Sequence, residues 1–95
     1  MIRVDVGPRL VRTARKLGPQ IQSKAEEALR LVAEHFGEPH RHSGLGLRKL
    51  GRFSYEARIW LQWRIVFAKE ADRLTAYDIM DHEEVRAWLK TRKGR

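Results

Sequence analysis

Residues 53–67 read FSYEARIWLQWRIVF, and this stretch decides the fold. Apolar and polar side chains alternate along it, which is the period of a half-buried strand. The apolar set is expected to face a packed layer of helices and comprises Phe53, Tyr55, Ala57, Ile59, Trp63, Ile65 and Phe67. The opposite set is charged, marks the face where function is expected, and includes Glu56, Arg58, Trp60, Gln62 and Arg64. The stretch therefore predicts an antiparallel hairpin, although the connection at 60–62 has no Gly, Asn or Pro to mark its turn.

The strand pattern continues downstream of the hairpin and gives way to a helix. Residues 69–72 (KEAD) predict a turn and residues 74–79 a third strand, which makes a three-strand meander. Asp81 followed by Glu84 is a capping-box pattern that starts a C-terminal helix. The basic tail, residues 90–95, is expected to fray.

Upstream of the hairpin, the pattern changes from a strand to helices and then to a loop. Residues 2–6 alternate as a short strand, and apolar side chains recur at helical spacing over 8–17 and 19–36. Gly18 and Pro19 separate the two helices. Residues 38–51 are rich in Gly, Pro, His and Ser, and they predict a basic loop.

These elements predict one α+β domain over residues 1–95. Its expected architecture is a twisted antiparallel sheet, made of the N-terminal strand and the three-strand meander. The sheet packs on an α-helical hairpin, and a short C-terminal helix follows.

Charge is the strongest global property of the chain. The formal net charge is +8, carried by 20 Lys and Arg against 12 Asp and Glu. Such an excess is typical of proteins that bind nucleic acid, although it also fits a patch for an acidic protein or a merely soluble surface. The chain has no cysteine, no apolar run near the roughly 20 residues of a membrane span, and no signal-like apolar stretch in MIRVDVGPRL. We therefore expect a cytoplasmic protein without a membrane partner.

Four segments resemble the RelE/ParE toxin superfamily of type II toxin–antitoxin systems. In chain order they are GLRKL (46–50), YEARI (55–59), WRIVF (63–67) and DIMDHEEV (78–85). The resemblance implies a twisted antiparallel sheet on a helical hairpin, and a toxin held inactive by an antitoxin partner. RelE-like members cleave mRNA in the ribosome, whereas ParE-like members act on DNA gyrase.

Two positions of this sequence favour the mRNA-cleaving group. Arg64 stands where those members carry a strand arginine at the phosphate, and His82 stands near the C-terminal histidine of the YoeB-like and YafQ-like members. The chain also departs from the pattern. It has no aromatic residue closely behind His82, and Arg58 is the nearest cation to the lysine pair of RelE-like toxins.

RNA cleavage by the 2′-hydroxyl needs a proton acceptor, a proton donor and cations on the phosphate. Histidine suits the proton transfers, and arginine suits the phosphate because its planar group binds two oxygens at once. We expect His82 to act as general base or acid, with Arg64 and Arg58 as a phosphate clamp. The alternatives are a helix-start histidine without function, and arginines that pair with Glu56 or Asp78.

The remaining candidates lie around this predicted centre. His40 or His42 could be the partner acid. A flexible polar loop in which neither histidine has a catalytic role explains this segment equally well, and two histidines alone make a weak metal site. Asp78 could orient His82 or form an ordinary salt bridge. The expected RNA-binding side chains contact the backbone or stack on a base, and they are Arg48, Lys49, Arg52 and Trp60.

The sequence therefore predicts a metal-independent mRNA endoribonuclease toxin without a cofactor. Its expected partners are an antitoxin, mRNA and the ribosome. The alternatives are a gyrase-inhibiting toxin that needs no catalytic histidine, and a basic RNA-binding module without catalysis.

Overall fold

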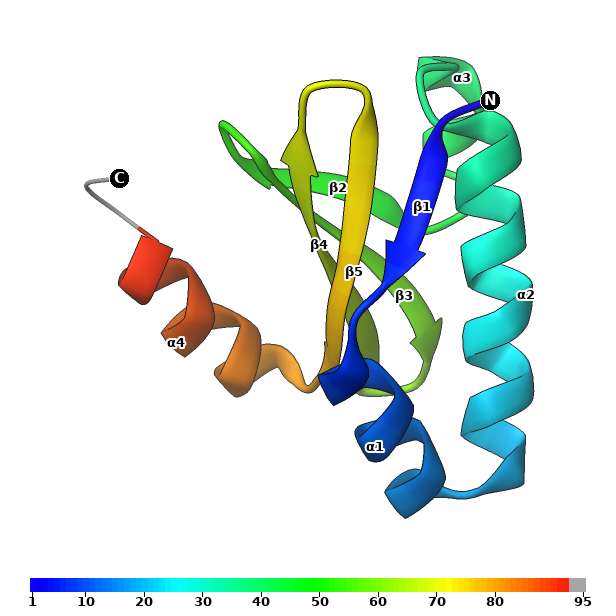
Figure 1. Cartoon of the computed structure of the whole chain (residues 1–95), viewed down its shortest axis with the longest axis vertical. Helices are drawn as coiled ribbons and strands as arrows, with labels where there is room; N and C mark the ends of the chain where they lie inside the picture. The colour runs from blue at the N-terminus through cyan, green and yellow to red at the C-terminus, as the bar shows by residue number, and fades with distance from the viewer. Residues whose placement is uncertain (93–95) are drawn as a thin grey trace.

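The computed structural model describes residues 1–92, which form a mixed sheet with helices on both faces (Figure 1). The last three residues of the basic tail, which we expected to fray, lie outside the described part. The elements in chain order are β1 (Arg3–Val6), α1 (Pro8–Leu17), α2 (Pro19–His35), α3 (Pro39–His42), β2 (Leu47–Gly51), β3 (Ser54–Trp60), β4 (Trp63–Glu70), β5 (Arg73–Met80) and α4 (His82–Arg92).

The strand order is β1-β5-β4-β3-β2, and the predicted meander is confirmed as β3, β4 and β5. The expectation of a wholly antiparallel sheet is wrong at one edge, because β1 runs parallel to β5, with Val4 opposite Leu74. Two strands joined by a tight hairpin turn must be antiparallel, whereas strands joined by a long connection can be parallel. Here the chain passes through three helices and reaches the far edge of the sheet before it returns to β5.

The segment 38–51, expected to be a loop, contains the short helix α3 and the edge strand β2. β2 pairs with β3 through Leu47 opposite Ala57 and Arg48 opposite Glu56. Its outward cations, Arg48 and Lys49, are typical of an edge strand that must not pair with another chain. Because Arg48 and Lys49 are charged and glycines flank the segment, residues 47–51 lack the alternating apolar pattern that predicts a strand.

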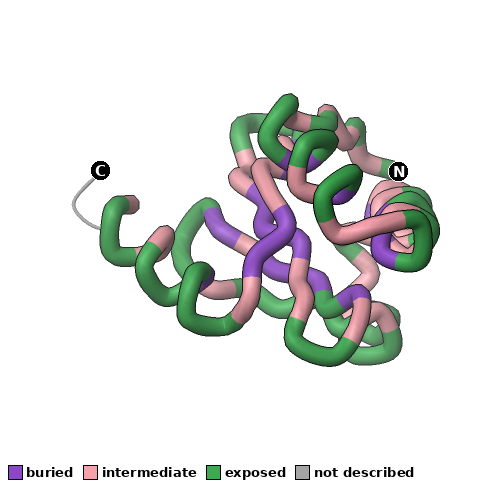
Figure 2. Tube along the Cα trace, turned by 90° about the horizontal axis from the view of Figure 1, so that it is seen from below, coloured by how far each residue is buried: buried purple, intermediate pink, exposed green. Residues whose placement is uncertain are grey.

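Helices α1 and α2 cover one face of the sheet, and the main core lies between the two layers (Figure 1). Buried residues gather along the central strands and the inner sides of the helices (Figure 2). The largest fully buried side chains are Phe67, Ile65, Leu74, Ile79, Val32 and Val66. On the other face, α4 packs through Val85 against Val66 and Met80 in a smaller cluster.

The predicted inner face of β3 and β4 is confirmed with two corrections. Phe53 lies in the β2–β3 turn and is 51% exposed rather than in the core. Trp60 is partly buried against the main core rather than standing wholly on the open face, although it still borders the same pocket as Arg58. The cause is a shift of register between Arg58 and Trp60 just before the β3–β4 turn. That turn lies at 61–62, and Leu61 adopts a positive φ of 34° in it.

Candidate functional site

An open pocket of about 760 Å³ lies on the face of the sheet that carries α4. It is bounded by the 43–46 loop, strands β2, β3 and β4, and the first residue of α4. Its lining comprises Ser43, Gly44, Leu45, Gly46, Leu47, Arg48, Glu56, Arg58, Ile59, Trp60, Arg64 and His82. The pocket thus contains three arginines, one carboxylate and one imidazole.

The predicted arginine pair lies in this pocket on one sheet face. Arg58 of β3 stands directly opposite Arg64 of β4 in the antiparallel ladder. The Arg58 side chain is exposed, whereas that of Arg64 is only 12% exposed. Arg64 donates from Nη1 to the carbonyl oxygen of Gln62 at 3.1 Å. This hydrogen bond fixes one side of the guanidinium, so that Arg64 is held in place while Arg58 is free to reach a ligand.

Glu56 is the carboxylate of the pocket, and its side chain is 8% exposed. Its Oε1 lies 3.5 Å from Nε of Arg64, and its Oε2 lies 3.4 Å from Nη2 of Arg48. A carboxylate so deeply buried needs opposite charges around it, and the two arginines supply them. The sequence indicated Glu56 only as a salt-bridge partner. Its place between two arginines depends on β2, which the sequence pattern did not reveal.

Gly46 brings the 43–46 loop against β3 beside Arg58. Its carbonyl oxygen accepts a hydrogen bond from the Arg58 amide at 3.2 Å. Gly46 has a φ of +65°, and a Cβ at this position would lie 3.2 Å from Cβ of Arg58. Glycine therefore allows both the left-handed conformation and the close approach that form this wall of the pocket.

His82 is the first residue of α4 and lies exposed at the pocket. The predicted capping box is confirmed directly before it. The Glu84 amide donates to Oδ1 of Asp81 at 2.9 Å, and the Asp81 amide donates to Oε1 of Glu84 at 3.1 Å. These two bonds fix the start of α4, and with it the backbone that carries the imidazole.

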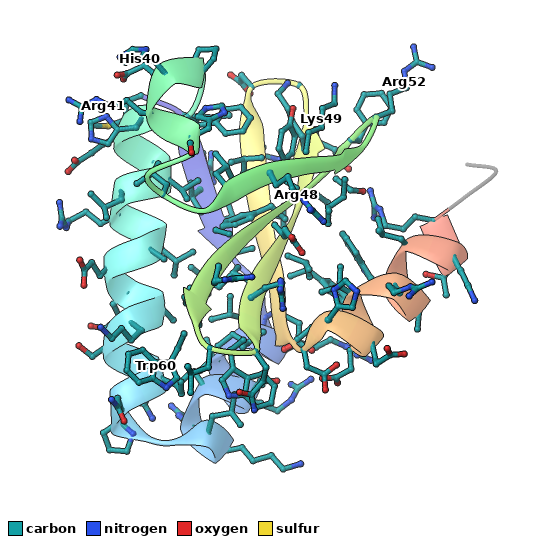
Figure 3. All side chains as sticks on the ribbon, turned by 180° about the vertical axis from the view of Figure 1, so that it is seen from behind. His40, Arg41, Arg48, Lys49, Arg52 and Trp60 are labelled. Atoms are coloured by element: carbon teal, nitrogen blue, oxygen red, sulfur yellow. The ribbon has the colours of Figure 1, made fainter. Side chains whose placement is uncertain are left out.

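The other two histidines considered for catalysis lie elsewhere. His42 accepts a hydrogen bond at Nε2 from the Gly37 amide at 3.2 Å, and its ring stacks on Phe36 at 5.7 Å. His40 lies on α3 (Figure 3). Together with His35 it lines a hollow other than the pocket of His82. Neither histidine is among the described residues that line the pocket of His82. The structure therefore does not bring them together as an acid–base pair.

Asp78, considered as a residue that orients His82 or forms a salt bridge, contacts α1 in the structure. Its Oδ1 accepts hydrogen bonds from Oγ1 of Thr13 at 2.6 Å and from the Ile79 amide at 2.8 Å. The carboxylate therefore fastens α1 to β5. Asp78 is also outside the described lining of the pocket.

The expected RNA-binding residues separate into two groups. Arg48 lies in the pocket, and Trp60 lies at its side near α2, where Nζ of Lys24 stands 5.0 Å from the ring (Figure 3). Lys49 pairs with Tyr55, whose ring packs on Phe36 on the helical side of the sheet. The guanidinium of Arg52 lies over Phe53, 5.4 Å from the ring centre, in the β2–β3 turn outside the pocket.

Within residues 1–92, no group of three or more His, Cys, Asp or Glu is placed to hold a metal ion. None of the helices described in this range has the length and apolar character needed to cross a membrane.

Comparisons with known proteins are sparse. No protein-family model matches the chain, and no curated protein matches it. Among solved structures, the chain is similar to the YoeB dimer from Staphylococcus aureus, with 15% sequence identity and a TM-score of 0.49. The similarity covers 85% of this chain and 97% of that one. A likeness this distant carries no argument about function, which rests on the pocket itself.

Proposed function

We propose that this chain is the toxin of a type II toxin–antitoxin pair and cleaves mRNA without a metal, with the ribosome as the setting. The observation that carries the proposal is the meeting of His82, Glu56 and three arginines in one open pocket. Cleavage by the 2′-hydroxyl needs these side-chain types and no bound metal ion.

The arginines provide the phosphate-binding part. Arg58 and Arg64 face each other across the two strands, so a phosphate between them would meet a cation on each side. A guanidinium binds phosphate through two parallel hydrogen bonds. Negative charge builds on the phosphate oxygens as the 2′-oxygen attacks, and cations already in place stabilise that charge most effectively.

His82 and Glu56 provide the two groups for proton transfer. One accepts the proton of the 2′-hydroxyl as its oxygen attacks phosphorus. The other donates a proton to the 5′-oxygen as the P–O5′ bond breaks. The products are a 2′,3′-cyclic phosphate and a 5′-hydroxyl. A neutral histidine can accept a proton and a protonated one can donate it, and the carboxylate of Glu56 can serve as the proton acceptor.

A basic toxin of this kind implies an acidic partner in the cytoplasm. Opposite potentials speed association and favour the correct partner. We propose an antitoxin whose acidic segment covers the pocket arginines and so competes with mRNA for them.

The direct test uses the purified chain, a defined mRNA and translating ribosomes. We expect cuts that leave a 2′,3′-cyclic phosphate and that disappear when the nucleotide 5′ to the cut carries a 2′-deoxyribose. His82→Ala should abolish the cuts and His40→Ala should retain them. Cleavage of the deoxy substrate, or equal cleavage by both variants, would contradict the proposed chemistry.

A further inference from the structure

Helix α4 carries His82, and Val85 is the one residue of its eleven that is fully buried. Trp88 and Leu89 pack against the same small cluster while partly exposed. The capping box fixes the backbone at residues 81–84. It does not by itself set the direction in which the helix leaves the sheet, and that direction decides where the His82 side chain lies.

A stack of cations and rings holds the far part of α4. The guanidinium of Arg9 lies 5.5 Å from the centre of the Tyr77 ring, and the Tyr77 and Trp88 rings stack with centres 5.8 Å apart and planes at 23°. The Arg92 guanidinium then lies 4.8 Å from the Trp88 ring. The stack therefore runs from α1 through β5 to the last turn of α4.

The stack ends on a buried polar atom. Nε of Arg92 donates to Oγ of Ser54 at 3.0 Å, and Ser54 is only 4% exposed. Cations over aromatic faces attract the ring electrons, and stacked rings add packing contacts. Together these contacts hold α4 at residues 88 and 92, one to two turns beyond Val85.

We propose that Tyr77 and Trp88 are positioning residues for His82. The stack and the capping box are two attachment points, and together they set the direction of α4 and keep the imidazole at the pocket that contains the arginine pair. The proposal rests on the proposed function for the role of His82, but the attachment of α4 can be measured independently of any cleavage.

The test compares Tyr77→Leu and Trp88→Leu with the conservative variant Tyr77→Phe, which keeps the ring. Amide hydrogen exchange should become faster along 82–92 in both leucine variants and stay slow in β3, β4 and β5. The kcat for RNA cleavage should fall by on the order of 100-fold, because a small displacement of a catalytic group has a large effect on rate. KM should change little, because Arg58 and Arg64 lie on strands. Tyr77→Phe should match wild type in both measurements.

Unchanged exchange in α4 and an unchanged kcat in the leucine variants would overturn the proposal. If a leucine variant loses protection in its strands as well, Arg9→Gln and Arg92→Gln test the same stack from its two ends without altering the apolar cluster. If the wild-type chain cleaves no RNA, the proposed function fails. The exchange data and the NMR signals of the His82 ring then still decide whether the stack positions α4.

Discussion

Arg58 and Arg64 stand directly opposite each other on β3 and β4, on the pocket face of the sheet. Like charges in this position destabilise a pair of strands. Glu56 approaches Arg64 at 3.5 Å, so Arg64 is compensated and Arg58 is left for another anion. Repulsion between the two guanidinium groups therefore lowers the stability of the free protein, and a bound phosphate would offset that repulsion.

Arg58→Gln should therefore have opposite effects on stability and binding. We expect the free protein to gain about 0.5 kcal/mol in free energy of unfolding, because the like-charge pair is removed. Binding of a short RNA should weaken, and the dependence of log K on log salt should become shallower by about one unit. Urea unfolding and fluorescence anisotropy measure the two effects. Arg41→Gln, on α3 outside the pocket lining, is the control. Equal losses of RNA affinity in both variants would contradict a specific clamp.

Glu56→Gln should lower both stability and cleavage. The neutral amide leaves Arg48 and Arg64 without their counter-charge, which we expect to cost about 1–3 kcal/mol of unfolding free energy. The cleavage rate should fall further than this loss of folded protein explains, because a proton acceptor is removed. The matched control is Glu70→Gln, whose side chain is 74% exposed. A Glu56→Gln variant that cleaves at the wild-type rate would exclude the carboxylate from the chemistry.

Gly46→Ala tests how the pocket wall is built. The new methyl group would meet Cβ of Arg58 at 3.2 Å on a backbone with φ of +65°. We expect a loss of about 1–2 kcal/mol from the left-handed conformation alone, together with weaker RNA binding as Arg58 is displaced. Gly51→Ala is the control, since a Cβ there meets nothing within 4 Å. Thermal unfolding of both variants provides the comparison, and similar Tm values would refute the close approach.

The sequence predicted the meander because its period-two pattern is local and its apolar face is buried. β2 was missed because an edge strand needs few apolar residues, and its centre reads Arg48-Lys49. The parallel pairing of β1 depends on contacts across nearly the whole chain, which no local pattern encodes. Trp60 was assigned wholly to the open face because the sequence does not reveal the register shift after Arg58 that breaks the alternation. Leu61, with its φ of 34°, forms a turn that residue preferences did not mark.

The sequence predicted part of the candidate site, namely the places of Arg58, Arg64 and His82. Alternation placed Arg58 and Arg64 on one face, and the capping box placed His82 at the end of the last strand. Glu56 could not be recognised as the carboxylate between two arginines, because Arg48 reaches it only through β2. His40 and His42 were candidates because the toxins that this sequence resembles can carry a histidine upstream of the sheet. The path of the chain instead turns His42 onto Phe36 and leaves His40 beside another hollow.

The most direct test of the central claim is growth of a bacterial host after induction of wild type, His82→Ala and His40→Ala, with mapping of mRNA 5′ ends. The proposed function predicts rapid arrest and new ends inside translated codons for wild type and His40→Ala, and neither effect for His82→Ala. Arrest without new mRNA ends would contradict it in favour of a target such as gyrase. RNA binding without arrest or cuts would contradict it in favour of a non-catalytic module.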